Sequence, residues 1–398
     1  MELAHPGGAM PAWSDLEWRI ARASAVAHGV SPLLWKHSGW SHPRWRRFLE
    51  DQHAHVAARH ARITALLARI DALARATGVA VTPLKGAALH ALGIYTAGDR
   101  PMADIDLLVD ECDIDAVAGQ MRAIGYVPSF DHWRHRVFKP AAGIPPAVLG
   151  EHRDTPITLE LHTRIRERLP VSVVDITERT RPRHPEPGLH PYPSRSALLA
   201  HLLLHAAGNI CGRSLRLVHL HDIALVARGM QPEEWVFLWQ DGACWWALPP
   251  LQMAARYCPD AIPAAVLDTL ASDCPPLLRI VSRHQTLTEV SCSELWLHAF
   301  PGLEWSRDVA DAIRYVLDRV RPSAEKIRER ADMVRTQLWL RDEDWVTATQ
   351  RKRILTWLIR RVPRMDIMFV ARMALADAPP VTGGNREVIR DGVCRGNA

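Results

Sequence analysis

The 398-residue sequence contains no two cysteines with the C-x-x-C spacing. Its seven cysteines are scattered along the chain, and an odd, dispersed set is typical of reduced thiols rather than of a disulfide framework or a zinc knuckle. The N-terminal residues lack a basic segment that leads into an apolar core, so we expect no signal peptide. Together these absences predict a cytoplasmic protein.

Long apolar runs and a strong charge bias are also missing. No stretch of about 18 uncharged apolar residues occurs, so we expect no membrane-spanning helix and no membrane partner. The formal net charge is only +5, whereas a dedicated nucleic-acid-binding protein usually carries a stronger basic excess. A hydrophobic fraction of 48% and a charged fraction of 23% indicate a globular protein with room for two or three domains.

Two aspartates separated by one residue lie in an otherwise apolar run, Met102–Val109. In a strand, side chains alternate between the two faces, so Asp104 and Asp106 point the same way. Two adjacent carboxylates repel each other unless a proton or a metal cation lies between them. The pair therefore predicts a divalent metal site. A strand with a solvated polar face stays open as the alternative.

The segment just upstream, Val79–Leu89, predicts a short apolar strand, a glycine-containing turn and the start of a helix. Free backbone N–H groups at a helix N-terminus can hold a phosphate. A phosphate-binding turn followed by a carboxylate pair indicates a metal-bound nucleoside triphosphate.

These motifs resemble the signature of the uncharacterised nucleotidyltransferases of the DNA polymerase β superfamily. The resemblance rests on three pieces of sequence, namely Leu84-Lys85-Gly86-Ala87, the pair Tyr95 and Arg100, and Asp104-Ile105-Asp106-Leu107-Leu108-Val109. It continues through Glu160-Leu161-His162 and the helix around His201 and His205, over roughly residues 79–228. The chain departs from the superfamily in having Ala87 where glycine or serine is usual, and in a longer gap before the acids.

The resemblance implies a metal-binding set of three carboxylates. Asp104 and Asp106 would hold two divalent ions, Mg²⁺ by preference with Mn²⁺ as the substitute. Glu160 lies on a predicted strand of alternating residues 157–162, and it would be the third carboxylate that binds the metal beside the acceptor and helps to deprotonate it. A salt-bridged strand residue is the alternative for Glu160.

The nucleotide phosphates are expected at the predicted turn. Gly86 and the N–H groups of Ala87 and Ala88 would receive them, with positive charge from Lys85 or Arg100. Lys85 has the alternative of packing beneath the sheet, whereas Arg100 lies in the loop just before the acid strand. The sequence slightly favours Arg100.

Three further side chains are expected near the acceptor or the nucleotide. His162 shares a strand face with Glu160, where it would orient the carboxylate or contact the acceptor. His205 and Asp222 lie on predicted helices that line the acceptor or nucleotide side in related enzymes. A structural role is the alternative for all three.

The pattern of elements predicts an α+β protein. It has a small mixed β-sheet nucleotidyltransferase core with N-terminal helices and a large C-terminal helical domain. The expected parts are an N-terminal helical segment (1–78), the core (79–181), a proline-rich linker (182–194), the helical domain (195–378) and a flexible tail (379–398). A long helix is expected from about 43 to 76, with a serine N-cap at Ser14 for the helix before it.

The resulting hypothesis is a Mg²⁺-dependent nucleotidyltransferase that moves a nucleoside monophosphate from a nucleoside triphosphate to a hydroxyl or phosphate acceptor. The acceptor stays open between a small molecule, a peptide and a protein, and natural-product tailoring is one such role. The alternative is a catalytically weak nucleotide-binding or scaffolding protein that retains the fold, as the alanine at 87 and the long gap suggest. A third hypothesis is a toxin that modifies a host molecule.

Overall fold

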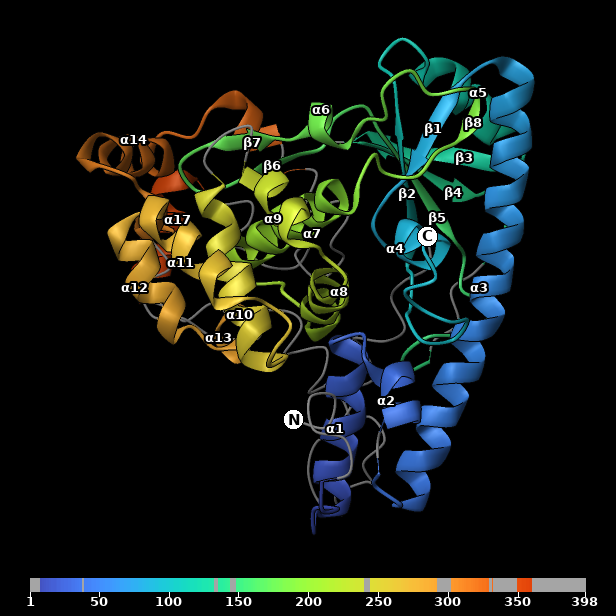
Figure 1. Cartoon of the computed structure of the whole chain (residues 1–398), viewed down its shortest axis with the longest axis horizontal. Coiled ribbons are helices and arrows are strands. Elements are labelled where there is room, and N and C mark those ends of the chain that lie inside the picture. The colour runs from blue at the N-terminus through green and yellow to red at the C-terminus, as the bar shows by residue number, and fades with distance from the viewer. Residues whose placement is uncertain are drawn as a thin grey trace.

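The computed structural model describes residues 8–37, 39–131, 135–143, 148–239, 244–291, 302–328, 331 and 349–359. They form a mixed six-stranded sheet, a long helix beside it and a group of helices on the other side of the molecule (Figure 1). The α+β class predicted from the sequence is confirmed. The tail predicted over 379–398 lies outside the described residues.

Three helices precede the sheet: α1 (Asp15–Ala27), α2 (Ser31–His37) and α3 (Pro43–Thr77). Ser14 caps α1 through a capping box with Glu17, as predicted. The 35-residue α3 ends at Gly78, whose φ of 75° is the left-handed conformation that glycine adopts without steric cost. The long helix expected from about 43 to 76 is therefore confirmed.

The sheet has the strand order β3-β4-β5-β2-β1-β8. Its strands are β1 (Ala80–Pro83), β2 (Asp104–Val109), β3 (Tyr126–Asp131), β4 (His135–Pro140), β5 (Thr158–His162) and β8 (Gly188–Leu189). The pairs β2/β5 and β1/β8 are parallel, and the others are antiparallel. The short helices α4 (Lys85–Ala91) and α5 (Ile114–Ala123) follow β1 and β2.

Two features of the strands were not expected from the sequence. The proline-rich segment contributes β8, whose residues pair with Ala80 and Val81 at the edge of the sheet. A separate hairpin is formed by β6 (Arg166–Arg168) and β7 (Val173–Asp175). Strands of two or three residues are too short to show a period-two pattern, so the tertiary fold decides them.

The remaining described elements are helical. They are α6 (Thr177–Thr180), α7 (Arg195–Gly212), α8 (Leu217–Arg228), α9 (Pro232–Trp239), α10 (Leu248–Tyr257), α11 (Ala264–Asp273), α12 (Pro276–His284), α13 (Leu287–Ser291), α14 (Val309–Val320), α17 (Gln350–Ile359) and two 3-10 helices, Trp245–Ala247 and Leu303–Trp305. Ser194 caps α7 by accepting a hydrogen bond from Ala197. Among the helices that the structure describes, none combines the length and the apolar character needed to cross a membrane.

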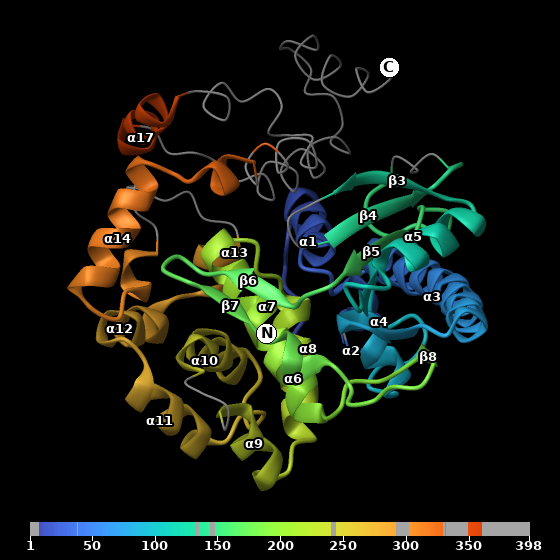
Figure 2. The ribbon, with the colours of Figure 1, turned by 90° about the horizontal axis from the view of Figure 1, so that it is seen from above.

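The two faces of the sheet belong to different hydrophobic cores. On β2, Ile105, Leu107 and Val109 pack in the core that the sheet shares with α3 and α5. Leu108, on the other face, joins the core that contains α7, α8 and α10. Seen from above, α3 lies on one side of the molecule, and α10, α11 and α12 lie on the other (Figure 2). The face of β2 that carries the two aspartates is therefore turned toward α7, α8 and α10, away from α3 and α5. The domain boundaries stay a prediction.

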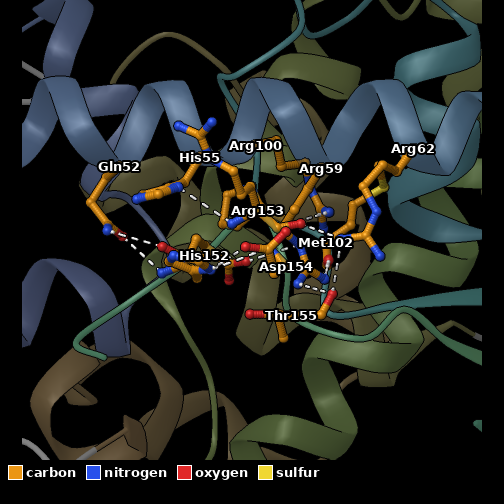
Figure 3. A network of polar contacts seen from close by, with 12 residues as sticks. Gln52, His55, Arg59, Arg62, Arg100, Met102, His152, Arg153, Asp154 and Thr155 are labelled. Carbon is orange, nitrogen blue, oxygen red and sulfur yellow. Dashed lines mark hydrogen bonds and ion pairs between the residues drawn. The ribbon is translucent and has the colours of Figure 1, made fainter. Parts of the chain in front are cut away.

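One buried arginine of α3 holds the segments that lead into the two central strands (Figure 3). Arg59 is only 2% exposed. Its guanidinium donates to the carbonyl of Met102 at 2.8 Å, just before β2, and to the carbonyl of Thr155 at 3.2 Å, just before β5. Its Nε lies 3.3 Å from the carboxylate of Glu151. The start of each acid-bearing strand is thus tied to the same helix.

Two further side chains of α3 attach the loop before β5 (Figure 3). The Gln52 amide donates to the carbonyl of Glu151 at 3.3 Å and accepts from its N–H at 2.9 Å. The ring of His55 accepts from the N–H of Arg153 at 3.3 Å. Side chains on the polar face of α3 therefore form the hydrogen bonds that backbone groups of this loop would otherwise make within a helix or strand.

We expect Arg59→Met to lower the free energy of unfolding by about 3 kcal/mol. The substitution removes the arginine partner of the half-buried carboxylate of Glu151 and the donor to the carbonyl of Met102, and breaking an ion pair whose arginine is buried costs on that order. Urea denaturation followed by circular dichroism measures the change. The exposed Arg62→Met is the control, with an expected loss below about 1 kcal/mol. Equal losses in the two variants would contradict the role of Arg59.

Candidate functional site

The acids predicted from the sequence lie together on one face of the sheet. In the parallel pair β2/β5, Asp104 lies opposite Thr158 and Asp106 lies opposite Glu160. Because side chains of paired residues project to the same side, Asp104, Asp106 and Glu160 share the face that the helices cover. Asp106 is 5% exposed. The structure thus brings all three predicted carboxylates into one cluster.

Lys85 neutralises the middle carboxylate of this cluster. Its ammonium lies 3.1 Å from Oδ1 of Asp106. Lys85 begins α4 with a φ of 47°, a left-handed conformation that costs a residue with a side chain about 1 kcal/mol. Its N–H donates to the hydroxyl of Tyr192 at 3.3 Å, which helps to hold this conformation. Lys85 therefore packs against the sheet. This packing is the alternative to a contact with the phosphates that the sequence left open.

Two histidines flank the acids on the same face. Nε2 of His162 lies 2.9 Å from Oδ1 of Asp106 and 3.7 Å from Oε2 of Glu160. Nε2 of His135, on β4, lies 3.4 Å from the same Glu160 oxygen. Burial by itself would lower the pKa of His162, but its hydrogen bonds to the two carboxylates outweigh burial and raise that pKa.

The environment separates the pKa values of the two aspartates. Burial raises the pKa of Asp104 to about 7, and the negative charges of Asp106 and Glu160 add to this effect. Burial also opposes ionisation of Asp106, but the charge of Lys85 and the hydrogen bond from His162 hold the pKa of Asp106 well below its usual range. Near neutral pH the cluster therefore needs a proton or a further cation at Asp104.

Arg100 lies against the turn at Gly86 but is bound to the helical part of the chain. Its Nε and Nη2 donate to the two oxygens of Asp222, on α8, at 2.8 and 2.7 Å. A Cβ added at Gly86 would collide with Nη1 of Arg100, so any other residue at this position would require Arg100 to shift. The hydroxyl of Tyr95 donates to Asp222 at 2.7 Å. Asp222 therefore joins the Tyr and Arg of the sequence signature to α8.

The turn itself is less open than the sequence suggested. The N–H of Ala87 donates to the carbonyl of Leu84 at 3.2 Å, and its side chain packs in the core of the sheet. Gly86 is buried as well. The phosphate contacts expected at Gly86 and Ala87 stay a prediction. His205, also expected near the site, lies on α7 with its Nδ1 3.6 Å from a carboxylate oxygen of Glu167.

The sequence did not single out His135. Tyr192 lies within the predicted proline-rich linker, and the sequence did not indicate that it belongs to the site. The hydroxyl of Tyr192 contacts Nδ1 of His201 at 2.7 Å and accepts from the N–H of Lys85. Burial, followed by the charge of Lys85, lowers the pKa of His201 well below its ordinary value, so its ring is neutral. His135 pairs with His162 through the antiparallel contact of β4 with β5, and no local sequence pattern predicts which strands become neighbours.

The donor set fits a divalent cation. Asp104, Asp106 and Glu160 are oxygen ligands of the kind that Mg²⁺ and Mn²⁺ bind. Lys85 balances one of the three negative charges. Burial and the neighbouring carboxylates raise the pKa of Asp104 to about 7, so a cation beside it would favour its ionised form. A cation at Asp104 and Glu160 would supply what the side chains lack.

A large cavity opens beyond the ends of the acid-bearing strands. It has a volume of about 930 Å³. Asp110, directly after β2, and Thr163, directly after β5, line it together with Arg181 and Trp246. Arg181 pairs with Asp110 at 3.1 Å. Asp110 lies four residues beyond Asp106, about 13 Å along a strand.

We expect Asp104→Asn to stabilise the metal-free protein at pH 8 by on the order of 2 kcal/mol. A carboxyl whose pKa rises on folding, here to about 7, destabilises the folded state fully above pH 7 and progressively less between pH 7 and about pH 4. The advantage of the variant should shrink as the pH falls through 7 and vanish below about pH 4, where the carboxyl is protonated in both states.

Urea denaturation in EDTA at several pH values measures this difference. Asp115→Asn is the matched control, because the Asp115 side chain is 86% exposed. Equal free energies of unfolding for Asp104→Asn and the unsubstituted protein at pH 8 would contradict the raised pKa of Asp104.

A family model described as "Uncharacterised nucleotidyltransferase" matches residues 14–262, which is more than half of the chain. No curated protein and no solved structure matches. The matched span includes β2, β5, the Lys85 turn, α7 and α8, which together build the acid cluster and its contacts. The chain therefore belongs to this family of uncharacterised nucleotidyltransferases.

Proposed function

We propose that the protein is a Mg²⁺-dependent nucleotidyltransferase that moves a nucleoside monophosphate from a nucleoside triphosphate to a hydroxyl or phosphate acceptor. The observation that carries the proposal is the register of β2 and β5, which sets Asp106 opposite Glu160 with Asp104 on the same face. Family membership supports the reaction type.

In this proposal Asp104, Asp106 and Glu160 hold the divalent ions. The ions supply charge neutralisation of the triphosphate and activation of the acceptor oxygen. Mg²⁺ is the ion proposed at the aspartates because it prefers oxygen ligands, and Mn²⁺ is the substitute. Glu160 is proposed to accept the acceptor proton, and its position on the strand next to the aspartates supports this role.

Positive charge for the phosphates is proposed to come from Lys85. Its ammonium already lies at the acid cluster, and three carboxylates raise its pKa in spite of burial, so it stays charged. Arg100 is proposed to act indirectly, because its Nε and Nη2 both donate to the carboxylate of Asp222. It would position the Gly86 turn rather than contact the nucleotide.

The acceptor is proposed to be a small molecule, a peptide or a protein. The cavity beyond the ends of β2 and β5 is proposed to hold the part of the acceptor that lies away from the reacting oxygen, about 13 Å from Asp106. Its volume of about 930 Å³ is in the range of sites for ligands of moderate size. Its lining carries side chains of both charges, such as Arg164 and Glu111, which pair at 3.4 Å. Such a surface suits an acceptor with several polar groups.

The second candidate function is a nucleotide-binding or scaffolding protein with little catalysis. Two observations favour it: the Ala87 N–H is bound within its own turn, and Lys85 is paired with Asp106. Calorimetric titration with ATP and Mg²⁺, followed by a pyrophosphate-release assay with a broad acceptor panel, separates the two. Binding without release would support the second function.

We expect Asp104→Asn, Asp106→Asn and Glu160→Gln each to lower the rate of pyrophosphate release by about 100-fold or more. Each substitution removes a charged metal ligand while keeping the side chain nearly the same size. The control is Asp115→Asn, on the exposed surface of α5, which should keep the full rate. Circular dichroism checks that the variants are folded. Unchanged rates in all three variants would refute the proposed site.

A further inference from the structure

We propose that His135, Glu160 and His162 form a binding site for a transition-metal ion of the Zn²⁺ or Co²⁺ type. This site goes beyond the proposed function, which calls for Mg²⁺ at oxygen ligands. The two sites share Glu160, and Nε2 of His162 also lies 2.9 Å from Asp106. They remain separable by experiment, because a metal can bind at the imidazoles whether or not the chain transfers nucleotides.

The geometry of the three side chains is that of a metal site. One ligand atom from each residue lies within 4.8 Å of the other two. Oε2 of Glu160 is 3.4 Å from Nε2 of His135 and 3.7 Å from Nε2 of His162. Ligands at about 2.0 Å from a tetrahedral metal lie about 3.3 Å apart. Small side-chain movements would therefore complete the coordination.

The ligand types decide which metals the site prefers. Two imidazole nitrogens and one carboxylate suit Zn²⁺, Co²⁺ and related ions, whereas Mg²⁺ favours oxygen ligands alone. Three protein ligands also leave a fourth position for water or substrate, as in catalytic zinc sites. The imidazole end of the acid cluster therefore differs in chemistry from the end that carries Asp104.

The backbone holds these ligands rigidly. His135 on β4 pairs directly with His162 on β5, and Glu160 pairs with Val137, so all three side chains project from the same face. Neither strand lies at the edge of the sheet, since β4 is between β3 and β5, and β5 is between β4 and β2. Val137 and Phe138 anchor β4 in the interior. A site built on paired inner strands is preorganised.

Co²⁺ tests the proposal because its visible absorption reports both nitrogen ligands and coordination number. The full chain is stripped with EDTA and titrated with Co²⁺ alone. We expect one tight equivalent with the intense spectrum of a four- or five-coordinate ion. His135→Ala should weaken binding of this equivalent at least tenfold, and the more conservative His135→Gln should do so as well. His284→Ala, which removes an exposed histidine of α12, should leave it unchanged.

Circular dichroism confirms that the His135 variants are folded, and His135→Gln serves if His135→Ala is not. Co²⁺ binding that is equally tight in the folded His135 variants, or a weak spectrum typical of six oxygen ligands, would overturn the proposal. Asp104→Asn separates this site from the proposed enzyme. This variant should abolish pyrophosphate release but keep the Co²⁺ spectrum. If the unsubstituted chain has no transferase activity, Co²⁺ should still bind at the imidazoles, so the failure of one proposal is distinguishable from the failure of the other.

Discussion

The structure depends on the electrostatic balance of three carboxylates that β2 and β5 hold on one covered face of the sheet. Mutual repulsion and burial raise the pKa of Asp104 to about 7. Lys85 and His162 stabilise the charge of Asp106, and they do so from two different elements. Such a cluster is costly for the fold, and strongly shifted pKa values of this kind are typical of functional sites.

Polar contacts from both sides of the sheet support this cluster. From one side, Arg59 of α3 ties down the entries to both acid-bearing strands. From the other side, His201 of α7 and Asp222 of α8 reach the same region, the first through Tyr192 and the second through Arg100. The matched family span, residues 14–262, contains all of these elements. The site is thus built from α3, the sheet, α7 and α8.

The two ends of the cluster offer a metal different partners. Around Asp104 the ligands are oxygens, which suits Mg²⁺. Around His135 and His162 they are largely nitrogens, which suits softer ions. Glu160 lies between the two ends, where it is available to either. If both are used, the identity of the metal at the second end would influence how strongly the acceptor oxygen is activated.

The sequence by itself determined the long helix, the acid strand and the placement of Asp104, Asp106 and Glu160 on strand faces, because these follow from local periodicity and capping. Only the tertiary structure decided which cations meet those acids. The contacts concerned join residues that are far apart in the chain. They are the ion pair of Lys85 with Asp106, the hydrogen bonds of Arg100 to Asp222 of α8, and the position of His135 beside His162. No local pattern encodes such pairings, since strand order and helix packing set them.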